Sequence, residues 1–97
     1  MNNSVSLPIK YSEATPKQRK LVREQYVDEQ DGLCYWCNTP LNGKAPKFIT
    51  DKKVNWKLFP PGFLRNPIHL QHNHDSDLTE GAVHAICNAV MWQYHRR

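Results

Sequence analysis

The sequence predicts a small α+β domain, and three observations lead to this fold class. The chain has 97 residues, which fits one domain spanning residues 1–97. Its last third alternates in a pattern typical of a strand, a turn, a second strand and a helix. Two short pairs of cysteine and histidine stand 46 residues apart, at spacings that suit one metal ion. A chain of this length buries a thin core, and small domains often compensate with a bound metal.

The first predicted element is a polar arm followed by a helix. Residues 1–15 have no regular apolar pattern, so we expect a flexible, irregular arm. Thr15 and Pro16 then predict a helix start, because threonine caps helix N-termini and proline suits the first helical position. Gly32 is expected to end this helix.

The predicted N-terminal helix has an apolar stripe and a basic first half. Leu21, Val22 and Tyr26 can share the apolar stripe. Positive charge is unfavourable near a helix N-terminus, and a phosphate partner would offset that cost. A solvated helix face explains the same charges equally well. The basic residues of this half are Lys17, Arg19, Lys20 and Arg23.

The middle of the chain predicts a hairpin and a loop rich in proline. Apolar and polar residues alternate over 47–58, which favours a strand, and residues 50–53 suit a turn. The segment interleaves lysines with aromatic residues, a composition that can follow a phosphate backbone. The simpler interpretation is that the aromatic residues complete a thin core. The lysines remain candidates for DNA contacts. These lysines are Lys52, Lys53 and Lys57.

The last third predicts the densest structure. "IHLQHNH" suits a short strand, "DSD" a turn and "LTEG" a returning strand, and "AVHAICNAVMWQYHRR" suits a helix that is apolar on most sides. Asp77 and Glu80 resemble a capping box that would start the helix earlier. The strand is preferred, because Gly81 is a poor residue for a helix interior.

The two spaced pairs predict a structural zinc site. Cys34 and Cys37 can reach one ion from a tight turn, and His84 and Cys87 can reach it from positions i and i+3 of a helix. Four protein ligands leave no open position for water, which is typical of structural zinc. A redox pair at Cys34 and Cys37, with Cys87 in the core, is the alternative. Zinc is favoured because it uses every cysteine of the chain.

Asn88 directly follows a predicted zinc ligand. Consecutive side chains on a helix diverge by about 100°, so Asn88 is expected to point away from the zinc and towards the histidine-bearing strand.

The stretch "LQHNHDSDLTEGAVHAICN", together with Cys34–Cys37, resembles the ββα-metal core of HNH (His-Me finger) endonucleases. The resemblance is nearest to the recombination endonuclease VII branch, and Gly81 falls on a family glycine. It covers Cys34–Cys37 and about residues 69–92. It implies a zinc-stapled ββα-metal core over residues 69–95, with the N-terminal helix as an addition.

The resemblance also implies roles for single residues. His72 would be the general base that takes a proton from the attacking water, for which a neutral imidazole is suited. Asn88 would offer an oxygen to a catalytic Mg²⁺ or Mn²⁺ ion that contacts the scissile phosphate. His74, expected on the same strand face as His72, would hold the phosphate or complete the metal shell.

Two positions depart from the family pattern. His84 stands where the family usually has cysteine, a chemically conservative exchange. Gln71 stands where it usually has the metal-binding aspartate, and a neutral carbonyl oxygen binds magnesium weakly. His69, two residues earlier on the same strand face, is a candidate substitute that would favour a softer ion such as manganese.

The net charge of +4 permits a nucleic-acid partner without requiring one. The expected partner is DNA in its double-stranded form. No stretch approaches the about 20 apolar residues of a membrane span. No apolar run typical of a signal peptide precedes residue 11. A cytoplasmic protein is therefore expected, and the small size and the resemblance to HNH endonucleases imply a phage or mobile-element origin. A non-catalytic zinc module with a degenerate site is the main alternative, and a nuclease acting on RNA is another.

Overall fold

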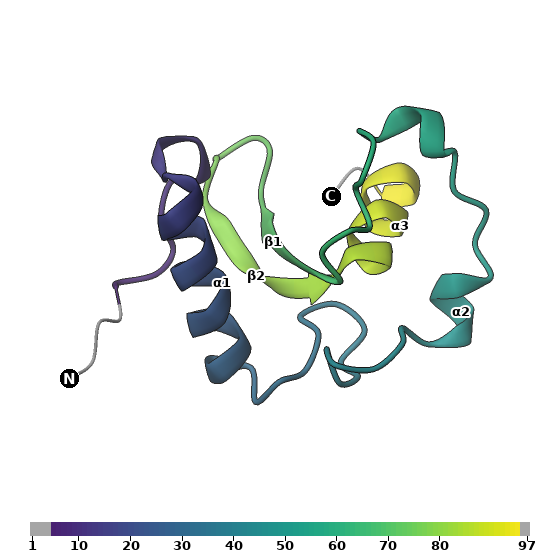
Figure 1. Ribbon diagram of the computed structural model, residues 1–97, viewed down its shortest axis with the longest axis horizontal. Coiled ribbons are helices and arrows are strands. Elements are labelled where there is room, and N and C mark those ends of the chain that lie inside the picture. Colours follow the sequence, from purple (N-terminus) through teal and green to yellow (C-terminus); the bar gives the residue numbers. More distant parts are fainter. Residues whose placement is uncertain (1–4, 96–97) are drawn as a thin grey trace.

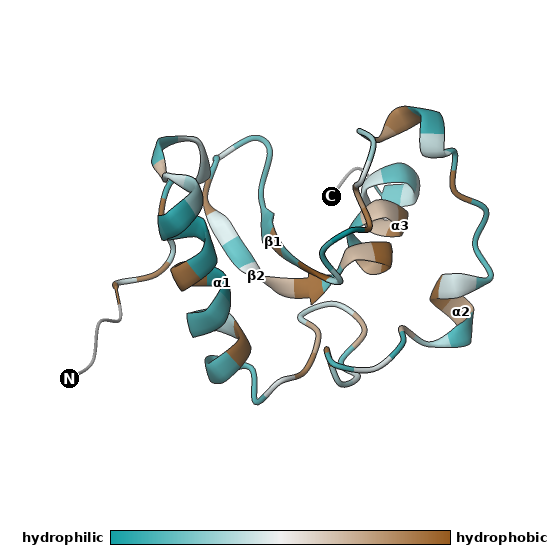
Figure 2. Ribbon diagram, viewed as in Figure 1, coloured by the Kyte–Doolittle hydropathy of each residue, from teal (hydrophilic) through white to brown (hydrophobic). Residues whose placement is uncertain are grey.

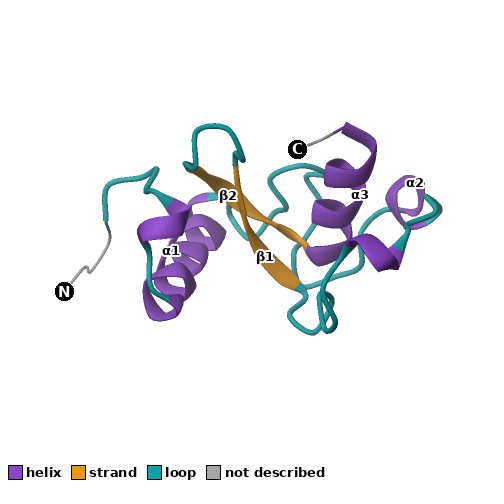
Figure 3. Cartoon of the chain, turned by 90° about the horizontal axis from the view of Figure 1, so that it is seen from above, coloured by secondary structure: helices purple, strands orange, loops and turns teal. Residues whose placement is uncertain are grey.

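The computed structural model describes residues 5–95, which form an α+β domain. Its main elements are helix α1 (Pro16–Glu29), strands β1 (Ile68–His72) and β2 (Thr79–His84), and helix α3 (Ala85–His95). The strands make a two-stranded antiparallel sheet that lies between α1 on one side and α3 on the other (Figure 1). Viewed from above, the twisted strands cross in the space between these two helices (Figure 3). Three short helical segments complete the fold, η1 (Tyr11–Glu13), α2 (Lys47–Thr50) and η2 (Trp56–Leu58).

Helix α1 begins where the sequence predicts. The Thr15 hydroxyl accepts from the Gln18 backbone at 3.1 Å, and the Gln18 side chain accepts from the Thr15 backbone at 2.8 Å. This reciprocal capping box satisfies two of the amides that a helix start leaves unpaired. After the helix, Gly32 adopts a φ of +74° and donates its amide to the Val27 carbonyl at 2.8 Å. Glycine reaches this left-handed conformation without strain, so it suits the turn that ends the helix.

Fewer apolar residues of α1 face the sheet than the sequence predicts. Val22 and Tyr26 are buried, whereas Leu21 is 52% exposed. Adjacent helical side chains diverge by about 100°, so Leu21 and Val22 cannot both face the sheet. The Tyr26 hydroxyl lies 2.9 Å from the Thr79 hydroxyl, which ties α1 to β2.

The segment over 47–58 contradicts the predicted strand and hairpin. It forms α2 and η2, which bracket an extended connection. Its backbone finds partners on α3 in place of a neighbouring strand. The Gln93 side chain accepts from the Asn55 amide at 2.8 Å and donates to the Lys53 carbonyl at 3.0 Å. An apolar alternation predicts a strand only where a partner strand has a free edge, and here side chains of α3 satisfy the polar backbone.

The N-terminal segment lies along the sheet. Lys10 and Leu78 form an antiparallel bridge, and the Asp77 carboxylate accepts from both the amide and the hydroxyl of Ser12. Residues 9–12 therefore extend the tip of the β1–β2 hairpin. Of the expected arm, residues 1–4 lie outside the described residues.

The predicted strand–turn–strand–helix order is present, with a shifted boundary. Strand β2 continues through His84, which pairs with Ile68 of β1, and α3 starts at Ala85. The prediction that the helix starts at residue 82 is therefore wrong, because residues 82–84 complete the strand pairing. His84 consequently occupies the end of a strand and not a helical turn.

The core lies where β2, the first turns of α3 and the inner face of α1 meet. Ala82, Val83, Cys87 and Val90 are at most 1% exposed. Figure 2 shows hydrophobic residues at the end of β2 and along the beginning of α3. Within residues 5–95, no helix combines the length and apolar character needed to cross a membrane.

Candidate functional site

The four predicted zinc ligands meet in one cluster. Sγ of Cys34, Cys37 and Cys87 and a ring nitrogen of His84 all lie within 4.8 Å of one another. In a tetrahedral zinc site, two sulfurs lie about 3.8 Å apart and a sulfur and a nitrogen about 3.6 Å. The His84 Nδ1 atom lies 3.3 Å from Cys37 Sγ and 3.6 Å from Cys87 Sγ. This donor set and these separations fit a metal ion such as zinc, and the prediction that the four residues gather is confirmed.

The orientation of His84 also fits a metal ligand. Its Nε2 atom lies 2.9 Å from the Pro40 carbonyl. A carbonyl only accepts, so Nε2 carries the proton and the lone pair of the neutral ring lies on Nδ1, the atom that faces the cysteines. Metal-binding histidines commonly donate their second nitrogen to a backbone carbonyl in this way.

Cys34 and Cys87 shift each other's pKa in opposite directions. Hydrogen bonding to Cys87 lowers the pKa of Cys34, whereas the same contact raises the pKa of Cys87. Cys34 and Cys87 are 1% and 0% exposed, so water does not screen the repulsion between two thiolates. A divalent cation at the centre of the cluster would allow all three to deprotonate.

A tight loop brings the first pair to the end of β2. Cys34 donates its amide to Thr39 at 2.8 Å, and the Tyr35 amide donates to the Ala82 carbonyl at 2.9 Å. Gln30 reinforces this attachment, since its side chain donates to Leu33 and Ala82 carbonyls and accepts from the Ala82 amide. The loop therefore docks on β2 beside the strand–helix junction that supplies the second pair.

The glycine at 81 has a steric role at this attachment. A Cβ atom there would lie 2.7 Å from the Gln30 Oε1 atom and 2.8 Å from the Tyr35 ring. Any larger residue must displace both side chains, so the close approach of Gln30 and the loop to β2 favours glycine.

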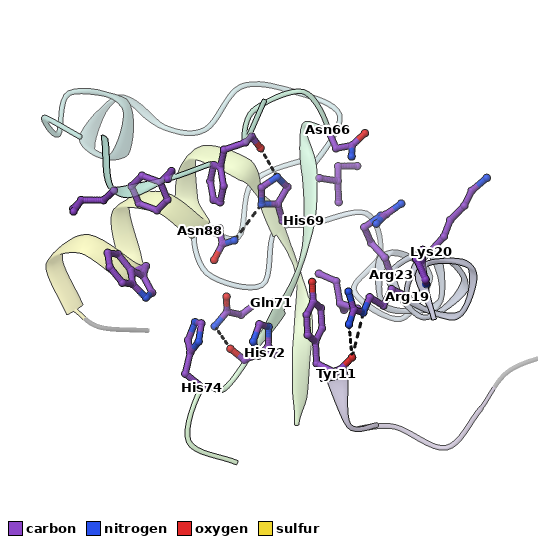
Figure 4. A pocket seen from close by; sticks show the side chains of 17 residues that line it. Tyr11, Arg19, Lys20, Arg23, Asn66, His69, Gln71, His72, His74 and Asn88 are labelled. Atoms are coloured by element: carbon purple, nitrogen blue, oxygen red, sulfur yellow. Dashed lines mark hydrogen bonds between the residues drawn. The ribbon is translucent and has the colours of Figure 1, made fainter. Parts of the chain in front are cut away.

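A cavity of about 640 Å³ lies beside the metal cluster and shares no residue with it. It has the size of sites that hold organic ligands, about 300–1,000 Å³. His69, Gln71, His72, His74 and Asn88 all line it, so the cavity collects every residue predicted for catalysis (Figure 4). Asn88 points away from the metal cluster, as its position after Cys87 predicts.

His72 is held between two aromatic neighbours. The Tyr11 ring stacks on it at 3.9 Å with an interplanar angle of 8°, and the His74 ring lies 4.6 Å away. Burial, followed by the charge of His74, lowers the pKa of His72. The imidazole therefore stays neutral at neutral pH, the form that accepts a proton. His74 lies in the turn after β1, so its nearness to His72 comes from the turn and not from strand alternation as predicted.

Asn88 is oriented by His69. The Nε2 atom of His69 lies 2.8 Å from the Phe63 carbonyl, which requires a proton on Nε2 and leaves Nδ1 as an acceptor. The Asn88 amide nitrogen lies 3.1 Å from that Nδ1. Burial lowers the pKa of His69, which keeps this ring neutral. The Asn88 nitrogen therefore donates to His69, and the Asn88 oxygen is directed elsewhere in the cavity.

The pairing of the two strands is irregular next to Gln71. The pairing shifts between Gln71, opposite Gly81, and His72, opposite Thr79, which leaves Glu80 as an extra residue. Every residue of β1, Ile68–His72, lines the cavity, so Gln71 and His72 share it with the regularly paired part of the strand. The Gln71 nitrogen donates to the His72 carbonyl at 2.8 Å. In Figure 4 the side-chain oxygens of Gln71 and Asn88 lie on facing sides.

The predicted DNA-binding lysines and arginines divide into two groups. Arg19 and Lys20 line the cavity, joined by Arg23. Arg19 also donates to the Tyr11 carbonyl at 3.0 Å, and its guanidinium lies 4.0 Å from the Tyr11 ring centre. The remaining candidates, Lys17, Lys52, Lys53 and Lys57, are exposed and lie outside the cavity lining.

Several cavity residues have no signal in the sequence pattern. Tyr11 belongs to the expected arm, and no local motif links it to a histidine 61 positions later. Phe59, Phe63 and Trp92 form a cluster on one wall, with ring centroids 4.7 Å apart for Phe59–Phe63 and 5.6 Å for Phe59–Trp92. For Phe59 and Phe63, the aromatic residues that alternate with lysines in the middle segment were the signal in the sequence.

Comparisons with models of protein families, with curated proteins and with solved structures find no match to this chain.

Proposed function

We propose that this protein is a metal-dependent endonuclease of the HNH (His-Me finger) type that cleaves DNA by hydrolysis. One observation carries the proposal. The His72 imidazole and the Asn88 amide, from different elements, line one cavity together with three cationic side chains of α1. Hydrolysis of a phosphodiester needs a general base, an oxygen ligand for a metal ion, and cationic side chains that bind the phosphates.

His72 acts as the general base. Its lowered pKa leaves the ring unprotonated at neutral pH, and the stacked Tyr11 ring restricts its rotation. The neighbouring His74 is exposed and is placed to hold a phosphate oxygen of the bound strand. Arg19, Lys20 and Arg23 supply the positive charge that attracts the backbone.

The cavity suits manganese better than magnesium as the catalytic ion. The described residues lining it include no carboxylate, and the donors that it offers to a metal ion are the side-chain oxygens of Asn88 and Gln71 and the His74 ring. Magnesium prefers anionic oxygen, whereas manganese tolerates neutral oxygen and nitrogen ligands. Asn88 would hold the ion, and the chemistry that the ion would supply is stabilisation of the leaving 3′-oxygen. His69 was predicted as a possible ligand, but both of its nitrogens already have partners, so we assign it the orientation of Asn88.

We propose zinc for the cluster of Cys34, Cys37, His84 and Cys87, with a structural role. Four protein ligands complete a tetrahedral shell and leave no position for water. The ion would clamp the Cys34–Cys37 loop to the junction of β2 and α3, and thereby hold Asn88 over β1. Double-stranded DNA as partner and a phage or mobile-element role in a host cytoplasm belong to the same proposal.

Plasmid nicking tests this function. Supercoiled plasmid is incubated with the protein and Mn²⁺ or Mg²⁺, beside the variants His72→Ala and His95→Ala. His95 is an exposed histidine at the end of α3 and serves as the matched control. Nicking by the wild type and by His95→Ala, but not by folded His72→Ala, is expected. DNA binding without cleavage under any divalent ion would instead support the alternative, a non-catalytic zinc module.

A further inference from the structure

The cavity has two chemically different walls. Arg19, Lys20 and Arg23 of α1 form one, and Leu58, Phe59, Phe63 and Trp92 form the other. Figure 4 shows the basic side chains on one side of His69 and Asn88 and the unlabelled aromatic rings on the opposite side. The predicted catalytic residues therefore lie between a cationic wall and an aromatic wall.

The aromatic wall is separate from the main core. Phe59, Phe63 and Trp92 are half-buried and in ring contact with one another, Phe59 also meets Trp56 at 5.8 Å, and none of the three belongs to the core cluster of α1, β2 and the start of α3. Phe63 also meets the His69 ring edge to face at 4.6 Å. The wall is thereby connected to the pair that orients Asn88, and its three aromatic residues line the cavity.

This combination matches one class of ligand. Cationic side chains attract phosphates, and aromatic faces stack with bases of any sequence. In a paired duplex the faces of the bases are covered by their neighbours, so only an unpaired or extruded base can reach an aromatic wall inside a cavity. The cavity volume of about 640 Å³ is within the range for enclosing one nucleotide-sized ligand.

We propose that the cavity binds one unpaired nucleotide of a DNA strand, with the base against Phe59, Phe63 and Trp92 and its phosphates against α1. The inference rests on the proposed function, because it names the substrate class of the same site. Within the double-stranded partner proposed above, the preferred substrate is then DNA that contains an unpaired nucleotide, such as a flap or a bulge.

A fluorescent base tests this proposal by binding alone. Three DNA probes carry 2-aminopurine at one position: a single strand, a duplex with that base bulged, and a fully paired duplex of the same sequence. Binding is measured without added magnesium or manganese, so that no strand is cut. We expect the wild type to bind the bulged and single-stranded probes about 5- to 150-fold more tightly than the paired duplex, with stacking that changes the 2-aminopurine emission.

Two conservative variants locate the effect. Phe59→Leu keeps an apolar side chain but removes the ring, and Phe48→Leu makes the same change at a 64% exposed residue of α2 outside the cavity. Phe59→Leu should lose most of the preference for the unpaired base, and Phe48→Leu should retain it. Equal affinity of the wild type for bulged and paired probes would overturn the proposal, and that measurement needs no variant to fold. Equal effects of the two substitutions would overturn it as well.

A cleavage arm separates this inference from the proposed function. With Mn²⁺ added, the same probes are incubated with the wild type and with His72→Ala. A preference for the unpaired base without any cleavage would refute the nuclease and leave the binding site standing. Cleavage of paired duplex that depends on His72, with no change in 2-aminopurine emission, would refute the nucleotide site and leave the nuclease standing.

Discussion

Replacing His84 by alanine should release the metal and destabilise the domain. The substitution removes one of four donors and also the hydrogen bond from Nε2 to the Pro40 carbonyl that orients the ring. A structural zinc site is worth about 10–16 kcal/mol, so one ligand contributes about 2.5–4 kcal/mol if the four share equally. The zinc affinity should accordingly fall by about 100- to 1,000-fold.

The loss of zinc affinity should also lower the melting temperature. A domain of this size has a stability of about 5–15 kcal/mol, so a loss of about 2.5–4 kcal/mol is a large fraction of it. For domains of 60–100 residues each kcal/mol shifts the melting temperature by about 4–8 °C, which predicts a decrease of about 10–30 °C. The free zinc concentration must be the same for all variants, because ligand binding itself raises stability.

Zinc content and thermal unfolding are the two measurements. The wild type and the His95→Ala control should retain about one zinc per chain after dialysis against a weak chelator, and His84→Ala should lose it. Because His95 is exposed and outside the cluster, its replacement controls for the loss of a histidine from the same part of the chain. If His84→Ala keeps its zinc and melts within a few degrees of His95→Ala, the cluster is not the metal site.

Three further predictions follow from the cavity and the loop attachment. Tyr11→Ala exposes His72 and should raise the pKa of His72 towards its ordinary value, because burial is the main cause of the lowered pKa. The acidic limb of the pH profile of nicking should then move to higher pH, whereas Tyr11→Phe, which keeps the ring, should leave it in place. Identical pH profiles of Tyr11→Ala and the wild type would exclude the stacking role. His69→Ala removes the acceptor that orients Asn88 and should reduce the Mn²⁺-dependent rate by about 10- to 100-fold at unchanged zinc content; a normal Mn²⁺ dependence would contradict this role. Gln30→Ala removes three hydrogen bonds between α1, the loop and β2 and should lower the free energy of unfolding by about 2–4 kcal/mol in urea titrations. Gln25→Ala, which removes exposed bonds of the same helix, is the control and should cost less than about 1 kcal/mol; equal losses would show that the attachment is not stabilising.

Features with short-range causes could be predicted from the sequence. The start of α1 depends on Thr15 and Gln18, three positions apart, and their capping box forms as the residue types indicate. The metal set could be inferred because Cys34 and Cys37, like His84 and Cys87, are close enough in the chain to share an ion in almost any local conformation. The direction of Asn88 follows from the same local geometry, since it adjoins Cys87 on one helix.

The tertiary structure decided everything that depends on distant partners. The alternation over 47–58 has no strand edge to pair with and becomes two short helical segments bonded to α3. His84 ends a strand because it pairs with Ile68. The residues next to His84 in the sequence give no sign of this pairing. The same holds for the register shift between Gln71 and His72, and for Tyr11, which reaches His72 because the N-terminal segment pairs with the hairpin tip.

The division has one physical reason. Caps, turn residues and closely spaced ligands act within a few residues, where the covalent geometry of the chain limits the possible arrangements. Strand pairing, ring stacking and the walls of a cavity join segments separated by tens of residues, and their geometry is set by how the whole core packs. The sequence by itself therefore determined which residues can bind a metal or accept a proton. The tertiary structure decided that the residues predicted for proton transfer lie between a cationic wall and an aromatic wall.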